Sequence, residues 1–286
     1  MKCVPTQDGT LTWYCDDYRE HYHSLGGAYL EAYRIYVKGC DLLEKARTCD
    51  EISILDIGFG LGYNVFVAIE NILAVRSWCK INVVSFEMDR SVLEFNQYPA
   101  SLHFWANRIK KHWLIQDDGV SFQDGQVDLK IYLQDARSKI ESLQKRFDAV
   151  FHDPFSHPKN PELWTVEFFS SLAKLTKPDG KLATYSMATP VLNAMDEAGW
   201  FPVLARGTGT KKYSVVATLE KEGGLSPHML EKLVRSTEKI PYRDLGLKQS
   251  RQSILKIRQE ACSKLKSNHS CTPSETRYEE GRYEFI

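Results

Sequence analysis

The sequence predicts an α/β fold built on a seven-stranded, mostly parallel, doubly wound sheet. Seven short apolar runs alternate with segments of helical spacing, which is the pattern of successive βαβ units. A glycine-rich turn at 58–62 joins the first run, 52–55, to a helical pattern over 65–72. Several runs end in an acidic residue, and the carboxyl ends of parallel strands meet at one edge of a sheet. We therefore expect a ligand site at that edge.

The composition excludes several classes of protein. Among 286 residues, 37 basic and 37 acidic side chains balance, so any contact with nucleic acid has to be local. No run approaches the roughly 18 to 20 apolar residues of a membrane span, and the first residues lack the apolar core of a signal peptide. The seven cysteines are scattered and form no C-x-x-C pair, which favours reduced thiols. We expect a soluble, cytoplasmic protein.

The glycine turn is the first candidate site. It runs Asp56-Ile-Gly58-Phe-Gly60-Leu-Gly62-Tyr-Asn64. Glycines let the backbone turn sharply and a ligand approach, and the following helix offers free N–H groups. The dinucleotide fingerprint needs G-x-G-x-x-G, which is absent. The turn instead resembles motif I of the class I S-adenosyl-L-methionine (SAM) methyltransferases, whose Rossmann-like fold has the predicted layout. An ordinary βα turn with surplus glycines is the alternative.

Two further strand ends support a SAM site. The second run ends in Glu87, followed by Met88, and a carboxylate there can accept hydrogen bonds from both ribose hydroxyls. A hairpin turn at 124–125 leads to a run that ends in Asp135, followed by Ala136. By resemblance, this third position holds the adenine amino group. A solvated acid at a strand end is the alternative for each.

The chain divides into three parts by pattern. Residues 1–50 precede the first core strand and form an N-terminal extension or lid, and 51–220 form the methyltransferase domain. Residues 221–286 form a helical C-terminal extension. Within it, 225–266 carry ten Lys or Arg against four acids, a net of about six positive charges. Such a segment can contact phosphates or can be a solvated packing arm, and both interpretations stay open.

A family resemblance covers roughly residues 10–220. Its most specific part is Asp-Pro-Phe-Ser-His-Pro-Lys-Asn-Pro-Glu-Leu-Trp-Thr at 153–165, and with it the chain resembles the MnmC-type tRNA methyltransferases. The other segments that carry it are 22–24 with Glu31, 58–64, 85–87 and 177–184, and 240–244 and 254–260 resemble the extension of stand-alone members. The resemblance implies SAM-dependent N-methylation of the aminomethyl group on a tRNA wobble uridine, with Tyr22 and Glu31 at the cofactor.

The chain also departs from the two-domain members of that family. These members carry an FAD-dependent oxidase domain, for which these residues offer neither length nor a dinucleotide fingerprint. We therefore expect no FAD, and we expect another enzyme to supply the aminomethyl precursor without a stable complex. The family block Asp-Gly-Phe-Ala-Pro is Asp153-Pro-Phe-Ser-His here.

Asp153, which ends the fourth run, is the predicted catalytic residue. An alkylamine has a pKa of roughly 10, so at neutral pH it arrives as a cation without a lone pair. Asp153 can hydrogen-bond this amine, orient it and relay its proton. Phe155, Trp164 and Tyr185 are candidates for stacking on an extruded uracil, and packing in the core is the alternative for each.

Some candidates lie outside this set. Arg206, Lys211 and Lys212 follow a late strand and can meet anticodon-loop phosphates; solvated loop charge is the alternative. The histidines have no defined ligand spacing, so we expect no metal site. The histidines considered are His21, His23, His152 and His157.

Three other functions stay open. Asp-Pro-Phe resembles the Asp-Pro-Pro-aromatic motif of adenine amino-methyltransferases, without its second proline. A polyamine aminopropyltransferase shares the fold and an acid at Asp153, but is expected to have three consecutive glycines where this chain has Gly58-Phe-Gly60. A non-catalytic SAM- or RNA-binding module is the third, and substitution of Asp153 separates it from the enzymes.

Overall fold

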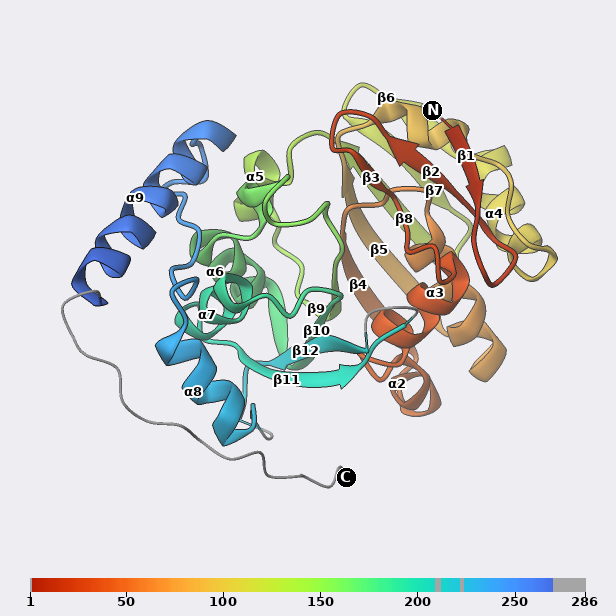
Figure 1. The fold of residues 1–286 in the computed structure, drawn as a ribbon. Coiled ribbons are helices and arrows are strands. Elements are labelled where there is room, and N and C mark those ends of the chain that lie inside the picture. The colour runs from red at the N-terminus through yellow and green to blue at the C-terminus, as the bar shows by residue number, and fades with distance from the viewer. Residues whose placement is uncertain (1, 209–211, 222–223, 270–286) are drawn as a thin grey trace.

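A computed structural model describes residues 2–208, 212–221 and 224–269. Its centre is a nine-stranded sheet in the order β11-β12-β10-β9-β4-β5-β8-β7-β6 (Figure 1). The strands are β4 (Glu51–Ile57), β5 (Lys80–Glu87), β6 (Leu114–Gln116), β7 (Gly119–Gln123), β8 (Val127–Leu133), β9 (Phe147–His152), β10 (Thr176–Thr184), β11 (Phe201–Arg206) and β12 (Tyr213–Thr218).

The five central strands β10, β9, β4, β5 and β8 run parallel. At one edge, β12 pairs antiparallel with β10 and β11 with β12; at the other, β7 pairs antiparallel with β8 and β6 with β7. The chain order reverses at β4, which lies between β5 and β9. In a doubly wound sheet this switch point is where ligands bind.

The doubly wound fold is confirmed, and the strand count is larger than predicted. The two extra strands are β7, the first arm of the predicted hairpin, and β6. All three residues of β6 are exposed. A three-residue edge strand with no buried face leaves no hydrophobic period in the sequence, which explains why the pattern missed it.

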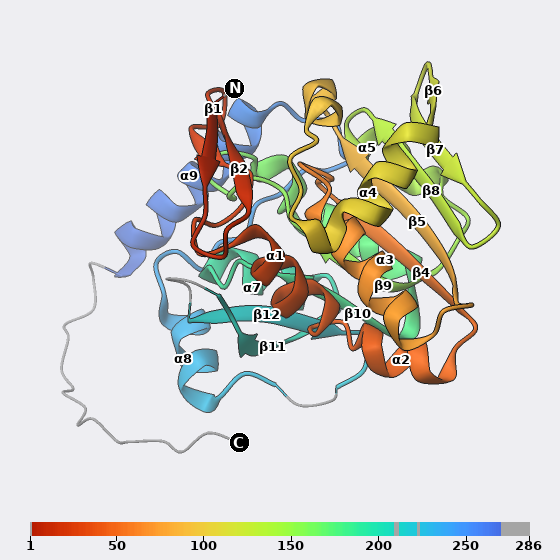
Figure 2. The same cartoon turned by 90° about the vertical axis from the view of Figure 1, so that its right-hand side faces the viewer.

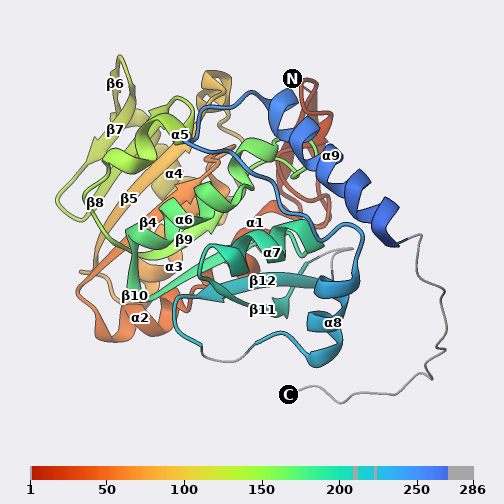
Figure 3. The same cartoon turned by 90° about the vertical axis from the view of Figure 1, so that its left-hand side faces the viewer.

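Helices cover both faces of the sheet (Figures 2 and 3). The first face carries α1 (Ala28–Glu31), the π-helix η1 (Ala32–Val37), α2 (Leu42–Thr48), α3 (Tyr63–Val75) and α4 (Ala100–His112). The other face carries α5 (Ala136–Lys139), the 3-10 helix η3 (Ile140–Ser142), α6 (Val166–Leu175) and α7 (Thr189–Glu197). The remaining 3-10 helices are η2 (Arg90–Glu94) and η4 (Pro161–Leu163).

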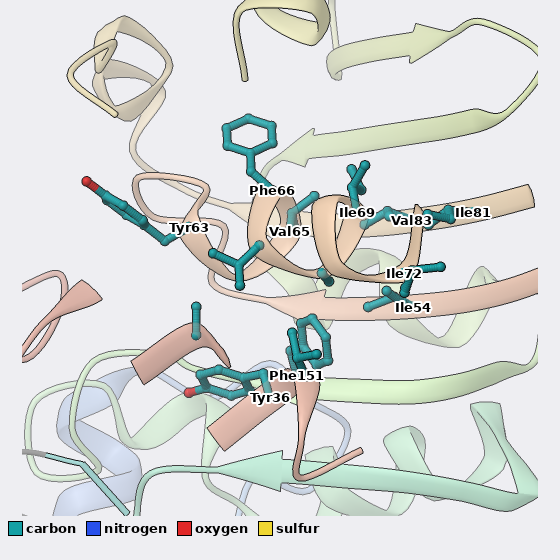
Figure 4. Close-up of a cluster of buried hydrophobic side chains, with 14 of the residues drawn as sticks. Tyr36, Ile54, Tyr63, Val65, Phe66, Ile69, Ile72, Ile81, Val83 and Phe151 are labelled. Carbon is teal, nitrogen blue, oxygen red and sulfur yellow. The ribbon is translucent and has the colours of Figure 1, made fainter. Parts of the chain in front are cut away.

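Helix α3 fixes the glycine turn against the sheet. Val65, Ile69 and Ile72 form its apolar stripe, and all three are fully buried (Figure 4). The stripe packs over β4 and β5, where Ile54 and Val83 are its neighbours. The spacing of three and four residues gives a helix one continuous apolar face. The start of α3 is therefore anchored where β4 ends.

The N-terminal residues form a small antiparallel sheet of β1 (Lys2–Pro5), β2 (Leu11–Cys15) and β3 (Glu20–His21). Helix α1 and the π-helix η1 follow this sheet, and α2 begins after them. The chain from β3 to α1 lies against the carboxyl edge of the central sheet, where it lines a cavity.

The C-terminal extension is docked on the methyltransferase domain. It contains α8 (Pro227–Arg235) and α9 (Arg251–His269). Between them Asp244 is fully buried and accepts hydrogen bonds from the Arg137 guanidinium at 2.8 Å and from the backbone N–H groups of Lys248 and Gln249. Residues 270–286 lie outside the described residues. In the described part of the chain, no helix is long and apolar enough to cross a membrane.

Candidate active site

A cavity of about 900 Å³ opens at the carboxyl ends of β4, β5, β8 and β9. Its volume falls within the range of small-molecule and cofactor sites, roughly 300–1,000 Å³. The predicted site residues that line it are Tyr22, Glu31, Gly58, Gly60, Glu87, Met88, Asp135, Ala136, Asp153, Phe155 and Tyr185. The parallel sheet therefore brings residues from distant parts of the chain to one place.

The glycine turn has the tight geometry that its sequence predicts. Gly58 has a φ of +96°, and a Cβ added there would lie 2.7 Å from the carbonyl oxygen of Asp153. The N–H groups of Gly58 and Phe59 both donate to the carbonyl of Phe86, which fixes the turn to β5. Any side chain at 58 would push the loop after β9 away. The glycine thus lets the turn and Asp153 share one wall of the cavity.

Glu87 is held in the cavity wall by three backbone donors. Its Oε2 accepts from the N–H of Gly60 at 2.8 Å, and its Oε1 accepts from those of Met88 at 2.7 Å and Asp89 at 2.9 Å. Burial raises the pKa of Glu87, while these hydrogen bonds act to lower it. A carboxylate has about four lone-pair sites, so Oε2, which accepts only one of these three bonds, can still accept from a hydroxyl group.

Asp135 caps helix α5 and forms an ion pair with Arg137. It accepts from the Arg137 backbone N–H at 3.0 Å, and its Oδ2 lies 2.7 Å from Arg137 Nη2. The same guanidinium reaches Asp244 and the carbonyl of Gln249. The third strand-end acid is therefore connected to the C-terminal extension, which the sequence did not predict.

Asp153 lies at the end of β9 and is oriented by two contacts. Its backbone N–H donates to Ile57 at 2.9 Å, and the side-chain amide of Asn64 donates to its Oδ2 at 2.8 Å. Asn64 itself is buried, and its Oδ1 has no partner among the described residues. Burial and then the charge of Asp153 hold the pKa of the buried Tyr36 phenol well above its usual value. The carboxylate is thus held in one orientation at the cavity.

Three residues predicted to contact the cofactor lie behind the cavity wall. Asp56 is fully buried beneath the turn and accepts from Ser85 Oγ at 2.5 Å, and burial raises its pKa well above the ordinary value. Gly62 begins α3, and Asn64 faces Asp153. None of the three lines the cavity, because the turn folds between them and the open space.

The N-terminal extension supplies the opposite wall of the cavity. The Tyr22 hydroxyl donates to Asp89 Oδ2 at 2.7 Å, which ties the extension to the loop after β5. Glu31 is buried and accepts from the N–H of Ser24 at 2.8 Å. Residues of the extension between 15 and 31 therefore complete the cavity.

The three aromatic candidates have different positions. Phe155 lines the cavity, and so does Tyr185, whose hydroxyl donates to the carbonyl of Pro154 at 2.9 Å. Trp164 is fully buried, and its indole N–H donates to the carbonyl of Phe155 at 2.9 Å. Its assignment to base stacking is therefore wrong in this arrangement, because the indole packs beneath the loop that carries Phe155.

The two described cations near β12 do not line the cavity. Arg206 ends β11 and Lys212 precedes β12; both side chains are exposed, and neither lines the cavity. Lys211 lies outside the described residues. The two described cations lie at the antiparallel edge of the sheet, away from the switch point.

Several residues that line the cavity were not predicted. They include Tyr18, Glu20, Glu162 and Arg251. Arg251 begins α9 and donates to Tyr18 across 233 sequence positions, so no local pattern could pair them. Glu20 accepts from the backbone N–H of Ser156 at 3.0 Å.

The cavity lining is predominantly acidic. Eight carboxylates face three guanidinium groups, and the acids are Asp17, Glu20, Glu31, Glu87, Asp89, Asp135, Asp153 and Glu162. A concave surface of one sign concentrates ions of the opposite sign. The site therefore suits cationic ligands, such as a sulfonium or an ammonium group.

The histidines considered as metal ligands have structural surroundings. His23 and His152 are buried, and burial lowers their pKa to about 4 and about 3. His157 Nδ1 lies 3.0 Å from the Tyr242 hydroxyl. Within residues 2–208, 212–221 and 224–269, no group of three or more His, Cys, Asp or Glu is placed to hold a metal ion.

Comparison with known proteins agrees with this geometry. A family profile described as S-adenosyl-L-methionine-dependent methyltransferase matches residues 100–220. The crystal structure of MnmC2 from Aquifex aeolicus superposes with a TM-score of 0.80 and 29% identity, covering 92% of this chain and 85% of that one. An uncharacterized protein of Methanocaldococcus jannaschii is 27% identical over 269 residues, covering 92% of this chain and 73% of its own.

The bifunctional MnmC proteins are similar over part of their length. That of Azoarcus sp. strain BH72, named for tRNA 5-methylaminomethyl-2-thiouridine biosynthesis, is 32% identical over 221 residues, or 72% of this chain. The chain spans about a third of the length of that relative, 33%.

The fold, the glycine turn and these matches define the chain as a class I SAM-dependent methyltransferase. Within that class, it is an MnmC-like methyltransferase. The residues present fit the cofactor: Gly58 leaves a cradle that a Cβ would fill, and two strand-end carboxylates, Glu87 and Asp135, face the same cavity.

Proposed function

We propose that the protein methylates the amino group of 5-aminomethyluridine, with or without 2-thiolation, at the wobble position of tRNA. The product is the 5-methylaminomethyl form. The observation that carries the proposal is Asp153, fixed by Asn64 at the wall of an acidic cavity beside the glycine turn. The printed names of the MnmC relatives support the substrate class.

In this proposal the cofactor binds along the carboxyl edge of the sheet. Glu87 accepts hydrogen bonds from the ribose hydroxyls, and Asp135 with Ala136 holds the adenine. Met88 lies beside the ribose contact, and Tyr22 and Glu31 close the opposite wall. Bound SAM supplies a methyl group already activated by its sulfonium. The chain therefore has to provide alignment and a free amine.

Asp153 has the task of providing the free amine. A carboxylate-lined cavity attracts the substrate ammonium, but a cation facing a sulfonium is repelled and has no lone pair to react. Asp153 hydrogen-bonds the amine, orients it and relays one proton to water, so that the nitrogen enters the reaction neutral. Asn64 keeps the carboxylate oriented through its 2.8 Å hydrogen bond. Tyr36 supplies a neutral wall behind it, because its raised pKa keeps the phenol protonated.

The partners follow from the substrate. The protein binds the anticodon loop of tRNA with the wobble base turned outward, and Phe155 and Tyr185 contact that base. Arg206 and Lys212 do not line the cavity, so contact with phosphate is the role that remains to be tested for them and for Lys211. Another enzyme supplies the aminomethyl group.

The test is methyl transfer from labelled SAM into tRNA that lacks only this methyl group. Nuclease digestion then identifies the labelled nucleoside. Label in 5-methylaminomethyluridine supports the proposal for both substrate class and position. If no tRNA is labelled although SAM binding persists in calorimetry, the proposed substrate is wrong and another amine is the acceptor.

A further inference from the structure

The outer wall of the cavity contains a stacked aromatic pair. Tyr18 lies on the turn between β2 and β3, and its ring faces Phe155 with the centroids 4.2 Å apart and the planes 15° from parallel. Both rings line the cavity. Phe155 follows Asp153 by two residues, so this stack stands directly beside the proposed reaction centre.

Arg251 holds Tyr18 in that position. Its Cζ lies 4.9 Å from the Tyr18 ring centroid, and its Nη2 donates to the Tyr18 hydroxyl at 3.1 Å. Its Nε donates to Glu162 Oε1 at 3.0 Å. Among the described residues Nη1 has no hydrogen-bond partner, although the guanidinium lines the cavity. The C-terminal helix α9 thus contributes a cation, with one free donor group, to the wall opposite Phe155.

We propose that Tyr18 and Arg251 form the outer half of a slot for the substrate base. The pyrimidine ring inserts between Tyr18 and Phe155, and Arg251 Nη1 donates to a carbonyl or thiocarbonyl at its edge. This inference rests on the proposed function, since it names how that function's substrate is held. In the proposed substrate one carbon joins the amine to the pyrimidine ring, so an amine held at Asp153 places this ring beside Phe155.

The slot has to open for the base to enter. At 4.2 Å the two rings are in contact, so Tyr18 has to shift outward by about 3.4 Å, the spacing of stacked bases. The turn that carries Tyr18 belongs to neither strand, and Arg19 in it has a left-handed φ of 54°. Non-glycine residues in this region are strained and are found at ligand clamps. Apart from the Phe155 and Arg251 contacts, the structure gives Tyr18 no further side-chain anchor among the described residues.

Two matched pairs of variants test the slot. Tyr18→Ala is compared with Tyr33→Ala, since Tyr33 is also stacked on a tyrosine beneath a cation but lies outside the cavity. Arg251→Ala is compared with Arg258→Ala, since Arg258 lies on the same helix, 4.8 Å from a tyrosine ring, and is also paired with a glutamate. The thermal unfolding temperatures of all four variants are measured, so that a kinetic loss caused by lower stability can be recognised.

The readouts are the kinetic constants for tRNA and the affinity for S-adenosylhomocysteine. We expect Tyr18→Ala to lower kcat/KM for tRNA roughly 10-fold or more, mainly through KM, which is the range for loss of one base stack. Tyr18→Phe keeps most of the activity. Arg251→Ala lowers kcat/KM for tRNA about 10-fold through loss of its hydrogen bond, and both control variants keep kcat/KM within about twofold of wild type. S-adenosylhomocysteine affinity is unchanged throughout. Equal kinetic losses in each variant and its control overturn the slot.

Failure of the proposed function has a different signature. If the wild type labels no tRNA, the slot is tested with benzylamine and propylamine, titrated calorimetrically in the presence of S-adenosylhomocysteine. The slot predicts that benzylamine binds more tightly and that Tyr18→Ala removes the preference. The absence of any preference in the wild type, including no binding of either amine, overturns it.

Discussion

The substitution Asp153→Asn isolates the proton-relay role of the carboxylate. The substitution preserves the shape of the side chain. In the wild type the Asn64 amide donates to Asp153 at 2.8 Å, and the Oδ1 of the introduced amide can still accept this hydrogen bond. Its Nδ2 can only donate, so it cannot take a proton from the substrate amine. The fold and the Gly58 contact, which involves the backbone of residue 153, should therefore persist.

The expected magnitude follows from the acid–base chemistry of the amine. With a pKa of about 10, only about one substrate molecule in 10³ carries a free amine at pH 7, and about one in 10 at pH 9. A variant that has to wait for free amine from solution should lose about 10²–10³ in kcat/KM at pH 7, which is within the range for general-base catalysis. It should recover roughly 100-fold between pH 7 and pH 9.

The assay is initial-rate transfer of labelled methyl groups into substrate tRNA from pH 6.5 to 9.5, with S-adenosylhomocysteine affinity measured by calorimetry. We expect that affinity to change less than about threefold. An Asp153→Asn enzyme within twofold of wild type at pH 7 would refute the proton-relay role. A large loss that high pH does not recover would instead assign Asp153 to positioning.

Three further outcomes are expected from other parts of the structure. Glu87→Gln should weaken S-adenosylhomocysteine binding about 10-fold or more, because one oxygen that accepts from ribose becomes a donor. The control is Glu44→Gln, at an exposed position on α2. Equal S-adenosylhomocysteine affinities of the two variants would contradict the assignment of Glu87. Asp244→Ala leaves the Arg137 guanidinium without its fully buried partner and should lower the free energy of unfolding in urea by about 3–5 kcal/mol, with faster hydrogen exchange in α9; unchanged stability would show that the extension docks without this pair. Burial lowers the pKa of His152 from 6.5 in the unfolded chain to about 3 in the folded one, so its contribution to the free energy of unfolding is full above pH 6.5 and declines as pH falls toward 3, by up to about 1.4 kcal/mol per pH unit. His152→Gln should flatten this dependence of the unfolding free energy on pH in urea melts from pH 7 to 4. An unaltered slope would refute the role of His152.

The sequence predicted the fold class and much of the inner wall of the site, because those features follow from local order along the chain. A strand followed by a glycine turn and a helix can be recognised at 51–75, and the acids at the ends of three further strands are local as well. A parallel sheet then brings Glu87, Asp135 and Asp153 to one edge without further information.

Two predicted site residues lie outside the cavity, at positions where packing competes with chemistry. Trp164 has the composition of a stacking residue, but the structure buries it beneath Phe155. Asp56 has the motif position of a ligand, but it lies beneath the turn and pairs with Ser85. An aromatic or acidic residue after a strand gives the same sequence pattern whether it lines the cavity or packs behind the cavity wall. Only its burial in the structure distinguishes these two positions.

The outer wall was decided by tertiary structure alone. Arg251 reaches Tyr18 across 233 positions, and Arg137 reaches Asp244 across 107. No periodicity or spacing records such pairs, because each depends on where the two extensions dock on the sheet. The chain's local pattern thus determined the inner wall of the cavity, whereas long-range packing of both extensions determined the wall that faces it.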